Sequence, residues 1–280
     1  ISIQTPWMQQ QLVPDLVVID EPLTGLITDG AHKFFKDRLS ILITTSTFSA
    51  LTQTWVPGLF SYADGATTKH YRYHFQAIFL SILEAAREKD VLDFSDAQRK
   101  GYEEAFVWIF ILLEDPRNEE ELAQVAGSLL SGCEHHYRKS VHKVSRAQGI
   151  LSKDSQTAFK RLAMDLCTVK TEAEFTATVE EIQNKFPQLF PWLNWWLEPE
   201  HARMIFDSQR TMSAETLASL PRTTNAEESM HNTLYHIAGQ DHDVLPGLEQ
   251  LVYAASWFEL RHRNALSELT YLCFLYTPSN

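Results

Sequence analysis

The stretch that decides the fold is LITDGA, residues Leu26–Ala31, in which apolar residues surround a single aspartate. An acid in the middle of an apolar strand costs stability unless it is hydrogen-bonded or binds a metal ion. Gly30, directly after the acid, lets backbone or a ligand approach closely. The stretch predicts a buried strand in which Asp29 has a functional role. Taken alone, Asp29 could also be an ordinary turn residue.

Two more strands are expected directly after this one. Ser40–Phe48 is rich in Ile, Leu and Thr, which favours a strand. Trp55–Tyr62 is a short apolar run that ends at the turn signal Ala63-Asp64-Gly65. Three strands with short links predict an antiparallel meander. Thr68–Lys89 then has apolar residues at helical spacing, which predicts an amphipathic helix.

A second acid lies at the end of another apolar run. Val91–Phe94 predicts a short buried strand that carries Asp93, and Ser95 is the expected N-cap of the helix that follows. Asp96 is the rival acid in this segment. Asp96 fits the exposed start of the helix, where a carboxylate complements the helix dipole. Asp93 is therefore the preferred site residue.

The remaining segments suggest how the chain is organised. Leu129–Gly132 predicts a fifth strand and Glu134–Ala147 a basic helix, after which strand signals vanish. The resulting order, β-β-β-α-β-α-β-α, is typical of an α/β ribonuclease H-like fold, with a mixed five-stranded sheet flanked by helices. An all-helical insertion precedes its last catalytic helix. We expect an N-terminal arm (1–25), the first part of the core (26–150), the helical insertion (151–220), and the final catalytic helix with C-terminal helices (221–280).

A third acid is expected on the helix that begins near Thr224. Glu227 and Glu228 are neighbours there, and neighbouring residues on a helix point about 100° apart, so only one can face a site directly. Cleavage of a phosphodiester by two metals needs carboxylates that hold two ions roughly 3.5–4 Å apart. Oxygen ligands of this kind suit Mg²⁺ or Mn²⁺.

Four motifs in order resemble those of Mutator-like element transposases. Leu26–Lys33 resembles the first-aspartate motif of that family, and Asp93–Gln98 is similar to the second. Cys133–Tyr137 resembles a cysteine-histidine motif that lies between the second and third acids. Thr224–His231 is similar to the third-acid motif, in which an asparagine stands three positions before the catalytic glutamate. No single motif is specific, but four in this order are specific together.

The resemblance implies a site and an activity. Counting from Asn225 selects Glu228, so Asp29, Asp93 and Glu228 are the expected catalytic and metal-binding residues, with two Mg²⁺ (or Mn²⁺) ions as cofactors. The implied activity is that of a DDE transposase, which cleaves DNA at transposon ends and joins them to target DNA. The resemblance also implies a homodimer and a nuclear location. A histidine and the asparagine of the third motif, His231 and Asn225, are expected to contact DNA.

The charge of the chain restricts where DNA can bind. A formal net charge of −12 argues against a surface that is basic all over. The helix Glu134–Ala147 is locally basic in this acidic chain and is the best candidate for phosphate contacts. The alternative is that its charged residues only face solvent, as most runs of charged residues do. The motif residues Cys133 and His136 are expected beside the DNA. The basic residues expected to contact it are Arg138, Lys139, His142, Lys143 and Arg146.

Several alternatives stay open from the sequence alone. Cys133, His135 and His136 could bind zinc, but their spacing lacks the paired ligands of structural zinc sites. The Trp192/Trp195/Trp196 cluster fits the core of a helical subdomain, and a role in stacking on a DNA base is the alternative. The chain could also be a domesticated transposase that binds DNA or protein without catalysis, or a ribonuclease H-like nuclease without strand transfer.

Cysteine content and hydropathy set broader expectations. The three cysteines are widely spaced, which argues against a disulfide framework. No apolar run reaches the roughly 20 residues of a membrane-spanning helix. We therefore expect an intracellular protein without a membrane partner.

Overall fold

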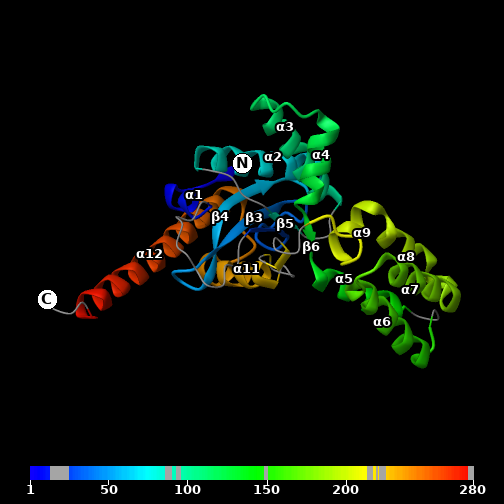
Figure 1. The fold of residues 1–280 in the computed structure, drawn as a ribbon. Helices are drawn as coiled ribbons and strands as arrows, with labels where there is room; N and C mark the ends of the chain where they lie inside the picture. Colours follow the sequence, from blue (N-terminus) through cyan, green and yellow to red (C-terminus); the bar gives the residue numbers. More distant parts are fainter. Residues whose placement is uncertain are drawn as a thin grey trace.

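The protein is described by a computed structural model with a mixed α/β architecture, as the sequence predicted (Figure 1). A single sheet has helices on both faces, and a group of helices lies beside its β6 edge. In the described part of the chain, no helix is long and apolar enough to cross a membrane. The described residues are 1–12, 25–85, 90–92, 96–147, 151–212, 217–218, 220 and 225–276.

The sheet of the described residues has six strands in the order β1-β4-β3-β2-β5-β6. Strands β1 to β4 pair antiparallel, whereas β5 pairs parallel to β2 and β6 parallel to β5. The expectation of five strands was one too few, because the N-terminal arm adds the edge strand β1 and the short helix α1 (Pro6–Gln11). The strands are β1 (Ser2–Ile3), β2 (Leu26–Ala31), β3 (Ile41–Ser49), β4 (Thr54–Ala63), β5 (Asp90–Leu92) and β6 (Ser131–Gly132).

The alternation of side chains along β3 explains why the sheet has two cores. Ile41 and Ile43 face α2 (Thr68–Ala85), α3 (Asp96–Leu112) and α4 (Glu119–Ser128), where Phe75 and Tyr102 are buried. Leu42 points to the opposite face and packs with residues of α11 (Asn225–Ala238) and α12 (Val244–Tyr276). Successive strand residues point to opposite faces, so an apolar strand such as β3 contributes side chains to both cores. Figure 1 shows α2, α3 and α4 on one side of the sheet and α11 on the other.

The predicted helical insertion consists of α6 to α9 and one 3₁₀ turn in its described part. Ser152 and Thr171 cap α6 and α7, and Thr171 forms a complete capping box with Glu174. These helices have their own hydrophobic cluster, which also takes in Tyr137 and Val141 from α5. The elements are α5 (Glu134–Ser145), α6 (Lys153–Thr168), α7 (Glu172–Lys185), the 3₁₀ turn η1 (Pro187–Leu189), α8 (Phe190–Leu197) and α9 (Pro199–Ile205).

A short break separates α11, which ends at Ala238, from α12, which begins at Val244. Helix α11 ends at Ala238, and Gly239 follows with a φ of 84°, a left-handed conformation that favours glycine at the end of a helix. The chain then pairs with the loop after β2: the His242 amide donates to the carbonyl of Phe34 at 2.9 Å. This contact fixes the start of α12 against the sheet.

A row of hydroxyl groups, all buried except the exposed Ser2 at its end, crosses the sheet on the α2 side. His74 of α2 lies in its centre, with Nε2 2.7 Å from Thr45 Oγ1 and Nδ1 2.7 Å from Ser61 Oγ. Thr28 continues the row beyond Thr45 and Ser2 continues it beyond Ser61, at 2.7 and 2.8 Å. The row satisfies polar groups that would otherwise be costly to bury. It also links β1, β4, β3 and β2 through side chains.

We predict that His74 makes the protein sensitive to acid. Burial, and to a lesser degree the positive N-terminus, lowers the pKa of His74 from 6.5 to about 3. Between pH 6.5 and 3, His74 is therefore protonated in the unfolded chain and neutral in the folded chain. The free energy of unfolding falls as the pH drops through this range. The contribution is up to about 1.4 kcal/mol per pH unit.

The measurement is the free energy of unfolding between pH 7 and 4. His74→Gln should flatten this dependence, and His32→Gln, at an exposed position, should leave it unchanged. An unaltered slope in His74→Gln would show that His74 does not carry the effect.

Candidate active site

Asp29 lies near the carboxyl end of β2, on the face that α11 covers. Its side chain is 17% exposed, and its Oδ2 lies 3.9 Å from Nδ1 of His231 on α11. Its Oδ1 accepts a hydrogen bond from the Gly30 amide at 2.7 Å. The residue opposite on β3 is Thr44, whose hydroxyl is fully buried and has no hydrogen-bond partner among the described residues. Asp29 is therefore a strand residue that faces a polar site, and the turn interpretation is wrong.

Gly30 is required by the packing on the other face of β2. A Cβ added there would lie 2.4 Å from Cδ1 of Ile41 and 2.9 Å from the hydroxyl of Tyr71. Both distances are shorter than real Cβ atoms show. The glycine therefore lets α2 pack closely behind the strand that presents Asp29, which agrees with the close approach predicted from the sequence.

Glu227 and Glu228 point in different directions from the first turns of α11. Glu227 is fully buried, and its Oε1 accepts a hydrogen bond from Ser46 Oγ on β3 at 3.1 Å. Glu228 has a side chain that is 44% exposed and lies 3.4 Å from Nζ of Lys139 on α5. The sheet-facing acid is thus Glu227, whereas Glu228 stands at the open rim between α11 and α5.

His231 lies between Asp29 and Glu227. Its Nε2 is 3.6 Å from Oε1 of Glu227, and its side chain is 8% exposed. Burial lowers the pKa of His231 from 6.5 to about 4, against an opposing effect of Glu228. The imidazole is therefore neutral near pH 7 and adds no positive charge to the acidic site. Asp29, Glu227 and His231 come together although β2 and α11 are far apart in the sequence.

The basic residues predicted on α5 all lie on its solvent-exposed side. Tyr137, Val141 and Ser145 form the buried side of the same helix. Two of the basic residues have acidic neighbours: Arg138 pairs with Glu134 at 3.3 Å and Lys139 with Glu228. The exposed set is Arg138, Lys139, His142, Lys143 and Arg146.

Two of the residues expected to contact DNA do not fit that role. Cys133, the N-cap residue of α5, is fully buried, so its thiol cannot reach DNA in this structure. His231 is buried against Asp29 and Glu227, so it belongs to the acid cluster instead. His136 is half-buried at the start of α5. The backbone of Asn225 begins α11, and its side chain lies outside the described residues.

The second acid, Asp93, lies outside the described residues. Leu92, the residue before it, ends β5 and pairs with Thr28, the residue before Asp29. Within the described part of the chain, no group of three or more His, Cys, Asp or Glu side chains is arranged to hold a metal ion. Cys133, His135 and His136, the residues of the zinc alternative, therefore do not form such a group in the described part of the chain.

The structure separates the three tryptophans of the insertion. Trp196 is buried and Trp192 half-buried, and the indole N–H groups of both donate to Ser140 Oγ at 3.3 and 2.6 Å. Both therefore belong to the core of the helical insertion, as the sequence favoured. Trp195 is 37% exposed, and one face of its indole stacks on His201 at a centroid distance of 3.8 Å.

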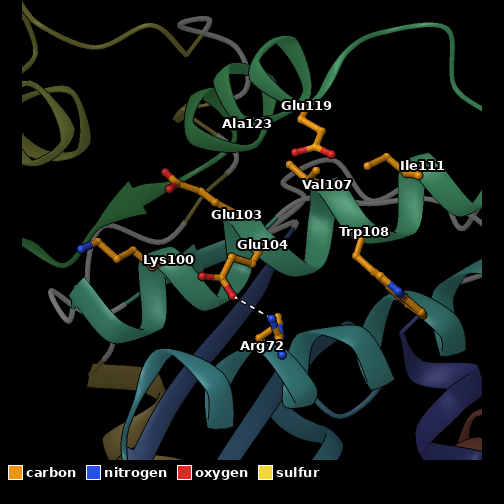
Figure 2. Close-up of a pocket in the computed structure, with 9 residues that line it drawn as sticks. All are labelled: Arg72, Lys100, Glu103, Glu104, Val107, Trp108, Ile111, Glu119 and Ala123. Atoms are coloured by element: carbon orange, nitrogen blue, oxygen red, sulfur yellow. Dashed lines mark hydrogen bonds and ion pairs between the residues drawn. The ribbon is translucent and has the colours of Figure 1, made fainter.

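A separate open pocket of about 570 Å³ lies between α2, α3 and α4 (Figure 2). Its lining includes the Arg72–Glu104 ion pair and the apolar side chains of Val107, Trp108 and Ile111. None of the predicted site residues lines it. The acid cluster is on the opposite face of the sheet, so the two features are independent.

Sequence reasoning missed Ser46 and gave Glu227 the lesser role. A signal was present, since Thr44–Thr47 is a run of hydroxyl residues within an apolar strand, and all four are buried. Buried hydroxyl groups need hydrogen-bond partners. The partner of Ser46 comes from a helix near the other end of the chain, which strand patterning cannot identify.

Comparison with known proteins gives no family assignment. No protein-family model and no curated protein matches the sequence. The arrangement of Asp29, Glu227, Glu228 and His231 is the basis of the functional proposal.

We predict that the two glutamates differ in their effect on stability. Glu227→Ala removes the acceptor of a buried hydroxyl group and should lower the free energy of unfolding by about 1–3 kcal/mol. Glu228→Ala removes an exposed ion pair and should change it by less than about 1 kcal/mol. Thermal and urea unfolding of the two variants measure the difference. Equal losses would contradict the opposite orientations of the two side chains.

Proposed function

We propose that the chain is the catalytic domain of a Mutator-like DDE transposase with a ribonuclease H-like core. The observation that carries the proposal is the meeting of Asp29 with the acidic first turns of α11 across a long stretch of sequence. The strand order β4-β3-β2-β5-β6, antiparallel and then parallel, supports the ribonuclease H-like interpretation of the element order. In this proposal β1 is an addition at the edge.

The residues at the carboxyl edge of β2 fit a pair of divalent cations. Asp29 offers a partly exposed carboxylate, and the buried Thr44 hydroxyl opposite it has no partner among the described residues. When bound, two Mg²⁺ or Mn²⁺ ions would supply activation of the attacking oxygen and stabilisation of the leaving one. Asp29, Asp93 and Glu228 would hold them.

Glu228 remains the proposed third ligand, and Glu227 has a supporting role. A carboxylate that binds metal at a cleavage site must be accessible to both the metal ion and the DNA. The half-exposed carboxylate of Glu228 at the rim is accessible in this way. Glu227 is enclosed and bound to Ser46. Its carboxylate would fix the position of α11 and, through His231, the surroundings of Asp29.

The exposed side of α5 is the proposed phosphate-binding surface. Lys139 links it directly to the acid site through Glu228. Five basic side chains on one helix oppose the net charge of −12, so DNA would be attracted to this side and repelled elsewhere. Dimerisation and a nuclear location stay predictions from the resemblance.

We predict that single acid substitutions abolish DNA cleavage without unfolding the protein. Asp29→Asn, Asp93→Asn and Glu228→Gln keep side-chain size but lose the charge that holds the ions. The measurement is Mg²⁺-dependent nicking of a transposon-end duplex, with strand transfer assayed separately on a pre-cleaved end. Asp165→Asn, at a partly exposed acid of α6, is the control and should retain activity.

The outcomes distinguish the alternative functions. Cleavage that persists in any of the three acid variants would overturn the proposed site. Wild-type nicking without strand transfer would indicate a ribonuclease H-like nuclease. A protein that binds no divalent metal and makes no nicks would favour a domesticated derivative.

We also predict that α5 sets the salt dependence of DNA binding. Lys143→Ala with Arg146→Ala should weaken binding and reduce the slope of log K against log salt by about 2, because each lost phosphate contact removes about 0.9. Lys153→Ala with Arg161→Ala removes the same charge from the exposed surface of α6 and should leave the slope unchanged. Equal effects in the two double variants would contradict α5 as the DNA surface.

A further inference from the structure

Helix α9 packs into two hydrophobic cores at once. Ala202 and Ile205 are buried in the cluster of the helical insertion. Met204, between them in sequence, is 2% exposed and belongs to the core that α2, α3 and α4 form on the sheet. The helix therefore joins the insertion to the sheet domain through its own side chains.

His201 of α9 bridges the insertion to the first residue of α3. Its Nε2 lies 3.0 Å from Oδ1 of Asp96, and its Nδ1 lies 2.7 Å from the backbone carbonyl of Trp195. Both partners are oxygen atoms, one of a carboxylate and one of the backbone. His201 is 2% exposed. It is therefore a buried side chain with an oxygen atom within hydrogen-bond distance of each ring nitrogen.

Charged groups lie on both sides of His201. The hydrogen bond with His201 is the main cause that lowers the pKa of Asp96. Glu198 Oε2 lies 3.6 Å from Nδ1 of His201, and Arg99 lies 3.7 Å from Asp96 on α3. The imidazole therefore lies between two carboxylates, and Arg99 offsets part of the charge of Asp96.

Arg203 makes a second contact between the same two helices. It donates to Oε1 of Glu103 at 3.0 Å, and Glu103 also accepts two hydrogen bonds from Arg99, at 3.0 and 2.8 Å. The Glu103 side chain is 18% exposed. Gly127 of α4 makes room for Arg203, since a Cβ there would lie 2.2 Å from its guanidinium.

The start of α3 is also bonded to β2. Gln98 is 1% exposed, and its Nε2 donates to the carbonyl of Thr28 at 2.8 Å. Thr28 directly precedes Asp29. The first turns of α3 are thus held between the strand that carries Asp29 and helix α9 of the insertion.

We propose that His201 and Arg203 are positioning residues, through which the helical insertion fixes the first turns of α3 against the Asp29 strand. The insertion then has a role in the sheet domain besides any contact with a ligand. The His201–Asp96 contact is the charged part of this link, and Met204 is its apolar part. The proposal does not depend on the proposed function, although a transposase would use the link to set the geometry around its acids.

A double-mutant cycle on the full chain tests the link. His201→Ala and Asp96→Ala should each lower the equilibrium constant for folding. If the two side chains interact, the effect of the double variant should be about tenfold smaller than the product of the two single effects. The control pair is Arg161→Ala and Asp165→Ala in α6, which should couple about twofold or less.

Amide hydrogen exchange shows which part of the chain loses stability when His201 is replaced. His201→Ala should speed exchange about tenfold at amides of residues 96–102, with no change in residues 248–258 of α12. Arg203→Ala, which leaves Met204 in place, provides the same readout if His201→Ala does not fold. Absence of coupling between positions 201 and 96, or a uniform rise in exchange over the whole chain, would each overturn the proposal.

Cleavage kinetics separate this proposal from the proposed function. In an active enzyme, His201→Ala should lower kcat about tenfold with KM nearly unchanged, because α3 is displaced while the α5 surface is intact. If the wild-type protein does not cleave DNA, the proposed function fails, and the coupling and exchange measurements still decide the role of α9.

Discussion

The rest of the structure depends on the central position of β2. This strand pairs with β3 on one side and with β5 on the other, in opposite directions. One of its faces is closed by α2, and a Cβ at position 30 would clash there with Ile41 of β3 and Tyr71 of α2. The other face is closed by α11, and Asp29 points towards it. A carboxylate placed there is largely, although not fully, removed from bulk water, so the surroundings of β2 must supply polar partners.

Those partners come from segments at opposite ends of the sequence. His231 and Glu227 on α11 approach from one side, and Ser46 and Thr44 on β3 lie on the neighbouring strand. Burial keeps His231 neutral near pH 7. His231 therefore adds no positive charge beside Asp29.

The helical insertion and the sheet domain are joined by charged contacts as well as apolar ones. Glu103 lies between Arg99 and Arg203, and Asp96 lies opposite His201. Buried ionic contacts contribute less to stability than their number suggests, because desolvation opposes the attraction. They do restrict the relative geometry of two helices, since an unpaired buried charge is costly. The start of α3 thus has one favoured position.

The sequence by itself determined most of the elements. Apolar and β-favouring runs predicted β2, β3 and β4, helical spacing predicted α2, and the alternation of elements indicated an α/β sheet. It did not reveal β1, because two residues are too few for a pattern. Tertiary structure alone decided which glutamate faces the sheet. Glu227 and Glu228 are equivalent in local propensity, and only the position of Ser46 and Lys139, on other elements, separates them.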